Sequence, residues 1–330
     1  MKKLLVFTIS ALAIGFIAGI FSYNKLPPLN KTGDKGFETR QGGFNFINPL
    51  LECQVGGENV EFSELVSFKK DLLSLVNSLK SKGWIDYASV YFRDLNNGPW
   101  FGINEKEKFT PASLSKVPLM MAYYKEAETN PKVLYDSIRF NGLHNETTFQ
   151  NIMPSVRLEP GRLYTVKELI HRMIVYSDNS AAMLLNKNVN QKRLVETFTD
   201  LGLPLPIGSS DNIFTVKQYA AFFRILFNAS YLNREMSEKV LELLSKTEFS
   251  EGIVGGVPPE IQVAHKFGER NYSGKNNGKQ LHDCGIVYYP EHPYLICIMT
   301  KGDSFERLDD SIKEISAFVF KNVDEQLKNK

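Results

Sequence analysis

Cysteine and net charge are both scarce in this chain of 330 residues. Its three cysteines, Cys53, Cys284 and Cys297, are too few and too widely spaced for a disulfide-rich scaffold or a zinc module. The 39 Lys and Arg are nearly balanced by 37 Asp and Glu, which leaves a formal charge of +2. Because nucleic-acid binding needs a basic patch or stripe, this balance gives no electrostatic reason to expect a nucleic-acid partner.

Internal repeats are also lacking, and the composition excludes collagen and coiled coils. Hydrophobic residues make up 43% of the chain and aromatic residues 12%, which is typical of a globular protein with a sizeable core. A length of 330 residues allows two domains or one large domain that mixes helices and strands.

One long hydrophobic run lies near the N-terminus. Residues 4–23 carry no charge and follow Lys2 and Lys3, and as a helix they would be about 30 Å long, the thickness of a bilayer core. Their one A-x-A sequence, residues 11–13, lies inside the run, which favours an uncleaved anchor over a cleaved signal peptide. We therefore expect residues 1–23 to form a single membrane span with the body outside the cytoplasm. Secretion after signal cleavage is the alternative.

The chain after this run divides into a linker and a body. Residues 24–57 contain several Pro and Gly residues without periodicity, which predicts an extracytoplasmic tether. Residues 58–330 form the body, which we expect to be monomeric.

The body alternates helices and strands. Apolar residues at helical spacing predict a helix over 62–82 and another near the C-terminus, and capping boxes at Thr165 and Thr215 predict two helices between them. Five segments are typical of strands: 87–93, 100–103, 262–269, 281–289 and 294–301. Short links between neighbouring strands favour an antiparallel sheet with helices on both faces, an α+β fold.

The first of three chemical motifs is S-x-x-K, from Ser113 to Lys116. Thr110 is a good N-cap and Pro111 suits the first helical position, so we expect Ser113 in the first turn of a helix. The helix N-terminus would favour negative charge near Ser113, and Lys116 would lie on the same face as a base if its pKa is lowered. Pro118 should bend this helix. The alternative is a solvated lysine at a helix start.

The second motif is Ser177-Asp178-Asn179, placed where one predicted helix ends and the next begins. Capping alone explains such a tripeptide. The functional interpretation is a second hydroxyl that relays a proton to a leaving group, with an amide that binds substrate.

The third motif is Lys266-Phe267-Gly268, on a predicted strand. A lysine on an edge strand commonly discourages aggregation, whereas a glycine in mid-strand lets a ligand approach the backbone closely. The strand edge would then offer the amide of Glu269 as an oxyanion donor and the ammonium of Lys266 as a carboxylate anchor.

Together, the three motifs resemble those of the penicillin-recognising serine enzymes, most closely the class A β-lactamases. The resemblance covers roughly residues 61–320 and extends to the phrases PASLSKVPLM, LIHRMIVYSDNSAAMLL and VAHKFGE. It implies a five-stranded antiparallel sheet beside an all-helical subdomain, with no metal and no organic cofactor.

The resemblance also implies roles for the motif residues. Ser113 would be the nucleophile that becomes acylated, Lys116 its base or base partner, and Ser177 the donor of a proton to the leaving nitrogen. The implied binding groups are Asn179 for the acylamino side chain, Lys266 with Gly268 for the substrate carboxylate, and the amides of Ser113 and Glu269 as the oxyanion hole.

Two departures from the family pattern concern hydrolysis. The glutamate that activates the deacylating water has no counterpart in the matching segment, 203–214, where Asp211 is the only carboxylate. Asp211 is a candidate substitute, although capping of the next helix explains it as well. Phe267 stands where the family has a hydroxyl residue, which removes one contact to the substrate carboxylate.

Three functions therefore stay open. The first is a β-lactamase-like hydrolase with slow deacylation, acting on a β-lactam. The second is a D-alanyl-D-alanine peptidase acting on peptidoglycan stem peptides, and the third is a penicillin-binding sensor that stays acylated.

Three residue pairs outside the motifs receive structural interpretations. We expect His282 and Asp283 to be a packed or solvent-edge pair, and His265 to face away from Lys266 by strand alternation. Cys284 and Cys297 lie on strands joined by a short turn, where a disulfide and two free thiols fit equally well.

Overall fold

The computed structural model describes residues 38–53, 63–96, 98–142, 150–203, 205, 213–272 and 278–328, which all fall in one compact unit. The predicted anchor over residues 1–23 lies outside these ranges. Within them, no helix combines the length and the apolar character that a membrane span requires.

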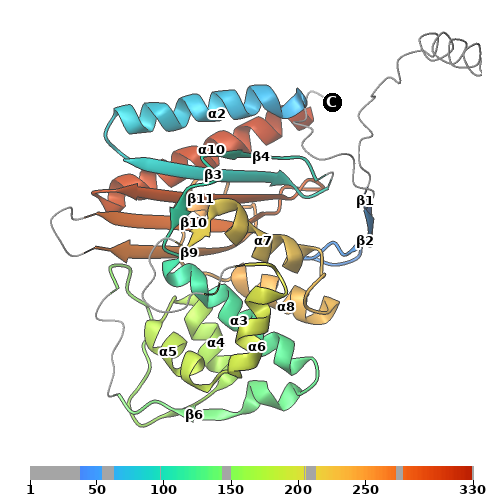
Figure 1. Cartoon of the computed structure of the whole chain (residues 1–330), viewed down its shortest axis with the longest axis vertical. Coiled ribbons are helices and arrows are strands. Elements are labelled where there is room, and N and C mark those ends of the chain that lie inside the picture. The colour runs from blue at the N-terminus through green and yellow to red at the C-terminus, as the bar shows by residue number, and fades with distance from the viewer. Residues whose placement is uncertain are drawn as a thin grey trace, which may run out of the picture. The chain divides into compact units, whose positions relative to one another are not determined.

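A five-stranded antiparallel sheet in the order β4-β3-β11-β10-β9 forms the centre of this unit (Figure 1). Its strands are β3 (Tyr87–Asp94), β4 (Trp100–Ile103), β9 (Val263–Asn271), β10 (Lys279–Val287) and β11 (Tyr294–Gly302). The five predicted strands are confirmed. Because β9 is an edge strand, the third sequence motif, Lys266-Phe267-Gly268, lies at the border between the sheet and the neighbouring helices.

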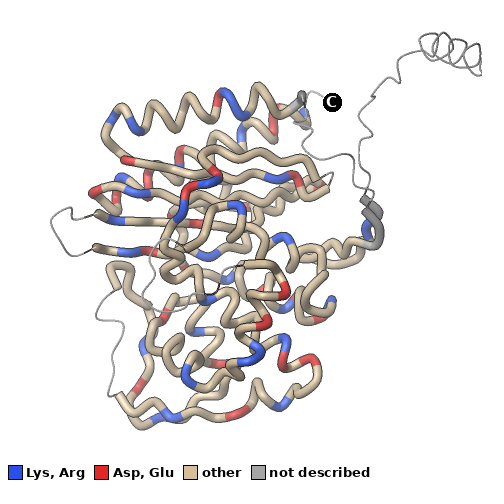
Figure 2. The backbone as a smooth tube through the Cα atoms, in the orientation of Figure 1, with Lys and Arg blue, Asp and Glu red and all other residues tan. Residues whose placement is uncertain are grey.

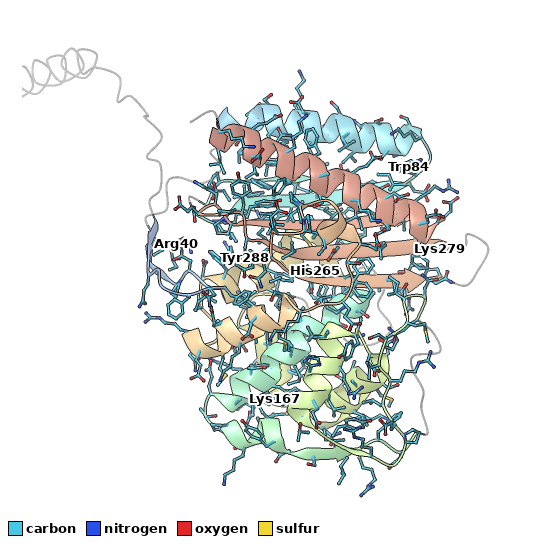
Figure 3. All side chains as sticks on the ribbon, turned by 180° about the vertical axis from the view of Figure 1, so that it is seen from behind. Arg40, Trp84, Lys167, His265, Lys279 and Tyr288 are labelled. Atoms are coloured by element: carbon cyan, nitrogen blue, oxygen red, sulfur yellow. A yellow bond between two sulfur atoms is a disulfide. The ribbon has the colours of Figure 1, made fainter. Side chains whose placement is uncertain are left out.

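Helices α2 (Ser63–Ser81) and α10 (Phe305–Lys328) cover one face of the sheet (Figure 3). Apolar side chains at helical spacing make this possible: Phe68 of α2 packs edge-on against Phe92 and Phe101, with ring centroids 5.1 and 5.0 Å apart. Leu72 of α2 and Ile312 of α10 are fully buried in the same cluster. The two helices predicted for the ends of the body are confirmed.

The other face of the sheet is covered by helices from the middle of the chain. α7 (Val216–Phe227) packs on β3, β10 and β11, and α8 (Arg234–Leu244) packs on β9. The remaining helices are α3 (Lys116–Ala127), α4 (Val166–Val175), α5 (Asn179–Asn188), α6 (Gln191–Thr199) and the short α9 (Gly252–Gly255). The structure therefore has the predicted α+β architecture.

Several short elements complete the described structure. They are the 3-10 turns η1 (Ala112–Ser115) and η2 (Pro131–Tyr135), with the strand pairs β5 (Lys108–Phe109) and β8 (Phe214–Thr215), and β6 (Ser137–Arg139) and β7 (Leu163–Thr165). Both predicted capping boxes are present: Thr165 with Glu168, and Thr215 with Gln218.

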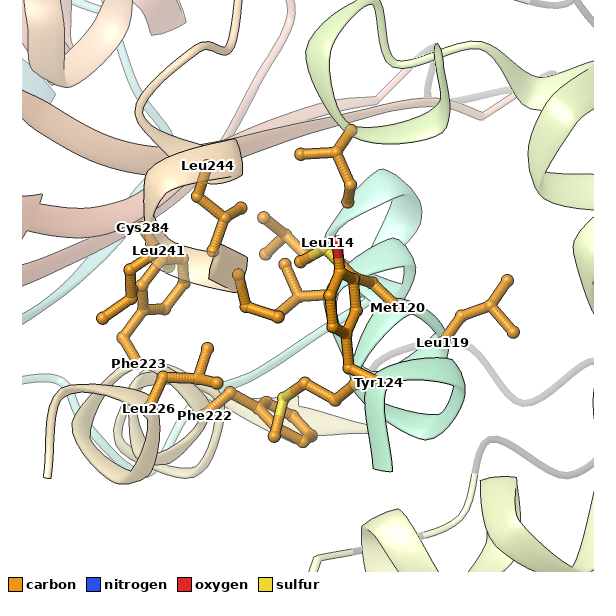
Figure 4. Close-up of a cluster of buried hydrophobic side chains, with 14 of the residues drawn as sticks. Leu114, Leu119, Met120, Tyr124, Phe222, Phe223, Leu226, Leu241, Leu244 and Cys284 are labelled. Atoms are coloured by element: carbon orange, nitrogen blue, oxygen red, sulfur yellow. The ribbon is translucent and has the colours of Figure 1, made fainter. Parts of the chain in front are cut away.

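A second hydrophobic cluster lies on the other face of the sheet, between the strands and the helices from the middle of the chain (Figure 4). Leu114, Met120 and, from α7, Phe222 and Phe223 belong to this cluster, and all four side chains are completely buried. Cys284 reaches this cluster from β10 and forms a disulfide with Cys297, its partner in register on β11. The disulfide settles the two alternatives that the sequence left open.

Residues 38–53 fold onto the body, although their Gly content favours a linker. They contain the paired strands β1 (Glu38–Arg40) and β2 (Leu50–Cys53). The Glu238 carboxylate accepts hydrogen bonds from the backbone N–H groups of Asn45, Phe46 and Ile47 at 2.9 to 3.2 Å. Phe46 and Ile47 are buried. The rest of the predicted tether, residues 24–37 and 54–57, lies outside the described residues.

We expect Glu238→Ala to loosen residues 45–47, because three amides lose their acceptor at once. The free energy of unfolding should fall by about 1–3 kcal/mol, and amide hydrogen exchange at residues 45–47 should accelerate. Glu235→Ala on the exposed side of the same helix is the control, with an expected change within about 0.5 kcal/mol. Equal effects of the two substitutions would contradict the assignment.

Candidate active site

Ser113 lies in η1, a turn that is held from two sides. The His282 Nε2 atom is 3.1 Å from the Thr110 carbonyl oxygen, and the Tyr219 hydroxyl donates a 2.8 Å hydrogen bond to the Leu114 carbonyl. Burial lowers the pKa of His282 to about 3, so its ring is neutral and its Nε2–H donates. Ala112, just before Ser113, has a φ of 48°, a strained conformation for a non-glycine residue.

The helix start differs from the prediction. Thr110 does not cap it; its hydroxyl is instead 2.5 Å from the Tyr272 hydroxyl. The chain first makes the 3-10 turn, and the α-helix begins only at Lys116. Ser113 is therefore in the turn before α3. Pro118 is the third residue of α3, where a backbone N–H has no partner within the helix, so it breaks no helical hydrogen bond.

Lys116 is buried, with 4% of its surface exposed. Its Nζ donates to the Ser177 carbonyl at 2.5 Å, to Asn179 Oδ1 at 2.7 Å and to Ser177 Oγ at 3.2 Å. Burial lowers the pKa of Lys116 to about 7, although the negative charges of Asp178 and Glu269 counteract part of this effect. A lysine with such a pKa is available as a base near neutral pH.

Lys266 approaches the same hydroxyl from β9. Its Nζ is 2.9 Å from Ser177 Oγ and 3.1 Å from the Phe267 carbonyl oxygen, and its side chain has no exposed surface. Burial lowers the pKa of Lys266 well below its ordinary value, and the positive charge of Lys116 lowers it further. The Phe267 ring centroid lies 4.0 Å from this Nζ. The ammonium predicted to anchor a substrate carboxylate is therefore covered.

Ser177 is held by a residue that the motifs did not reveal. The Gln150 side chain donates to the Ser177 carbonyl at 3.0 Å and accepts from the Asn179 N–H at 3.2 Å. Ser177 itself has a φ of 54°. No sequence pattern distinguishes Gln150, because its contacts are with residues almost 30 positions away.

The middle residue of the second motif is a cap. Asp178 accepts from the N–H groups of Ser180 and Ala181 at 2.7 and 3.2 Å and so begins α5. Burial raises the pKa of Asp178. Within this motif, Asp178 therefore caps a helix, whereas the Ser177 hydroxyl contacts Lys116 and Lys266.

Gly268 allows β9 to press against the turn that carries Ser113. A Cβ atom at this position would lie 3.0 Å from the Leu114 nitrogen and 3.0 Å from the Pro111 carbonyl oxygen. The space that the sequence assigned to a ligand is therefore filled by the protein's own turn. This contact places Glu269, the next residue, beside the turn of Ser113.

The sequence also did not reveal the part played by the Glu269 side chain. Its Oε1 accepts from the backbone N–H groups of Asn151 and Ile152, both at 2.8 Å. Burial raises the pKa of Glu269, although these hydrogen bonds counteract part of the effect. The carboxylate thus joins β9 to residues 150–152.

The remaining candidate residues lie elsewhere. Asp211 is outside the described residues. Asp283 does not pair with His282: its carboxylate is 2.9 Å from His265 Nδ1, and His265 lies on the next strand.

Within the described ranges, no group of three His, Cys, Asp or Glu residues could hold a metal ion. Acidic and basic residues are interspersed along the chain (Figure 2).

Comparison with known proteins places the chain in a family. A family model described as the beta-lactamase enzyme family matches residues 69–323, whereas no curated protein sequence matches the chain. A beta-lactamase from Sphaerobacter thermophilus has a TM-score of 0.65 at 20% identity, over 77% of this chain and 96% of that chain.

Two further solved structures have the same fold. A beta-lactamase from Chitinophaga pinensis has a TM-score of 0.66 at 18% identity, over 77% of this chain and 99% of that chain. A point mutant of PBP-A, solved as an acyl-enzyme complex with penicillin G, has a TM-score of 0.64 at 18% identity, over 78% and 97% of the two chains. The predicted resemblance is confirmed, because the family model spans more than half of the chain and these structures share its fold. The protein belongs to the beta-lactamase enzyme family and is a β-lactamase-like serine hydrolase.

Proposed function

We propose that the protein forms an acyl-enzyme at Ser113 with β-lactams or related acyl-D-amino-acid amides and releases it slowly. The observation that carries this proposal is the position of Ser177 Oγ, between the Nζ atoms of Lys116 and Lys266 at 3.2 and 2.9 Å. A hydroxyl between two buried lysines can pass a proton in either direction.

Acylation would proceed in two steps. Neutral Lys116, directly or through the Ser177 hydroxyl, takes the Ser113 proton while Ser113 Oγ bonds to the amide carbon. The backbone amides of Ser113 and Glu269 then stabilise the negative oxygen. When the C–N bond breaks, its electron pair goes to nitrogen, and Ser177 delivers the proton. Asn179 would bind the acylamino side chain.

Slow release follows from the state of a nearby carboxylate. Asp178, whose charge influences the pKa of Lys116, accepts two backbone N–H groups at the start of α5. A carboxylate held in this way is poorly placed to activate a water. Asp211 remains the candidate substitute proposed from the sequence. The acyl-enzyme reported for the PBP-A mutant with penicillin G supports this type of intermediate.

The same observation favours a second function, that of a D-alanyl-D-alanine peptidase acting on peptidoglycan stem peptides. Such an enzyme needs acylation at Ser113 and a leaving amine but no carboxylate dedicated to β-lactam hydrolysis. Within the part of the chain that the structure describes, no feature specifically favours a sensor that stays acylated. On the uncharged run over residues 4–23, we also propose attachment of the body outside the cytoplasm, with secretion as the alternative.

Intact-protein mass spectrometry of the full chain mixed with benzylpenicillin tests the acyl-enzyme. We expect one added penicillin that persists after the free compound is removed, and no adduct with Ser113→Ala. Ser67→Ala is the matched control, because Ser67 begins a second S-x-x-K sequence, on the exposed side of α2. An adduct on Ser113→Ala would contradict the nucleophile, and rapid loss of the adduct would contradict slow release.

We expect Gly268→Ala to slow acylation about 100-fold, because a displacement of about 1 Å at a reacting group has effects of this size. The added methyl group would push the turn of Ser113 away from β9, while thermal unfolding should still show a folded protein. Gly42→Ala is the control, since no heavy atom lies within 4 Å of its Cβ position. Acylation of Gly268→Ala at the wild-type rate would show that this contact does not set the position of Ser113.

A further inference from the structure

We propose that the backbone amides of Asn151 and Ile152 form the carboxylate subsite for the acyl donor, and that Glu269 occupies this subsite until the donor displaces it. This inference rests on the proposed function and names the group that recognises the anionic part of the donor. It requires only the exchange of one carboxylate for another, without any change in covalent bonds.

The two amides converge on a single point. The N–H groups of Asn151 and Ile152 both donate to one oxygen of Glu269, at 2.8 Å each. Successive backbone N–H groups aimed at one oxygen are a recurring way in which proteins bind anions. The site is therefore built for a carboxylate, and the structure contains one there.

The amide pair is fixed next to the reacting groups. Gln150, the preceding residue, is bound to the Ser177 carbonyl and to the Asn179 N–H. On the other side, Glu269 follows Gly268, where β9 comes close to the turn that contains Ser113. The amide pair is thus linked through Gln150 to the motif of Ser177, and through Glu269 to the strand that contacts the turn of Ser113.

Lys266 is less suited than the Asn151 and Ile152 amides to bind the donor carboxylate. Its ammonium has no exposed surface, is bound to Ser177 Oγ and the Phe267 carbonyl, and is covered by the Phe267 ring. The family's hydroxyl at position 267 is also missing. A donor carboxylate that cannot reach Lys266 can instead bind the amides of Asn151 and Ile152.

Glu269 is a replaceable occupant. While its Oε1 accepts two hydrogen bonds, its Oε2 is buried without a hydrogen-bond partner. A buried carboxylate oxygen without a partner is unfavourable, so the contact can be given up for a donor that satisfies the amides better. Donors with a carboxylate should therefore be preferred, and Glu269 should limit this preference.

The test compares acylation by benzylpenicillin with acylation by its methyl ester, in which the carboxylate is masked. We expect Glu269→Ala to raise the ratio of the two rates about tenfold or more, because the amides are vacated and the competing charge is removed. Glu269→Gln should raise the ratio less, because its amide oxygen can still accept from both N–H groups. Glu248→Gln is the matched control, since Glu248 holds the same segment through Ser155 at 2.6 Å, and its ratio should stay at the wild-type value.

Amide hydrogen exchange gives a second measurement that does not depend on the covalent reaction. In Glu269→Ala, exchange at Asn151 and Ile152 should accelerate, and benzylpenicillin but not its methyl ester should slow it again. An unchanged rate ratio in Glu269→Ala, equal ratios in the Ala and Gln variants, or equal protection by acid and ester would overturn the proposed subsite. Failure of both compounds to acylate any variant would contradict the proposed function, while the exchange measurement would still decide on the subsite.

Discussion

The Ser177 hydroxyl lies between two lysine ammonium groups, at 3.2 Å from Lys116 Nζ and 2.9 Å from Lys266 Nζ, and neither lysine is open to solvent. Burial lowers the pKa of both groups, and the positive charge of Lys116 lowers that of Lys266 further, so the site favours a state in which one lysine is neutral. The three residues come from α3, from the junction of α4 and α5, and from β9. The helical part and the sheet therefore meet at this contact, and the chemistry depends on holding them in register.

Several features of the fold maintain that register at a local cost. Gly268 lets β9 touch the turn of Ser113, and neutral His282 ties the same turn to β10. Ala112 and Ser177 both have positive φ angles without being glycine, and strain of this kind persists only where the surrounding structure imposes it. The disulfide between β10 and β11 and the packing of α2 and α10 on the sheet supply a rigid support for these positions.

The sequence predicted what depends on short-range patterns. Strand alternation and capping boxes such as Thr165 with Glu168 located the elements. The three motifs identified Ser177, Lys116 and Lys266, which the structure brings into contact. Features that depend on distant partners were not predictable: Gln150, the Glu269 side chain, and the docking of Phe46 beside Glu238 follow from contacts across many residues. Thr110 was misjudged as a cap because a 3-10 turn, which the residue types do not distinguish from an α-helix, precedes α3.

The proposed acylation depends on Lys116, which burial would make a base for Ser113 near neutral pH. The most direct test is the rate of acylation by benzylpenicillin from about pH 5 to pH 9, because the neutral fraction of a base grows tenfold per pH unit below its pKa. We predict a rate that rises with pH and levels off at a pH of about 7, the pKa of Lys116. A rate that continues to rise towards the ordinary lysine pKa of 10.5, or one that does not change with pH, would contradict this prediction.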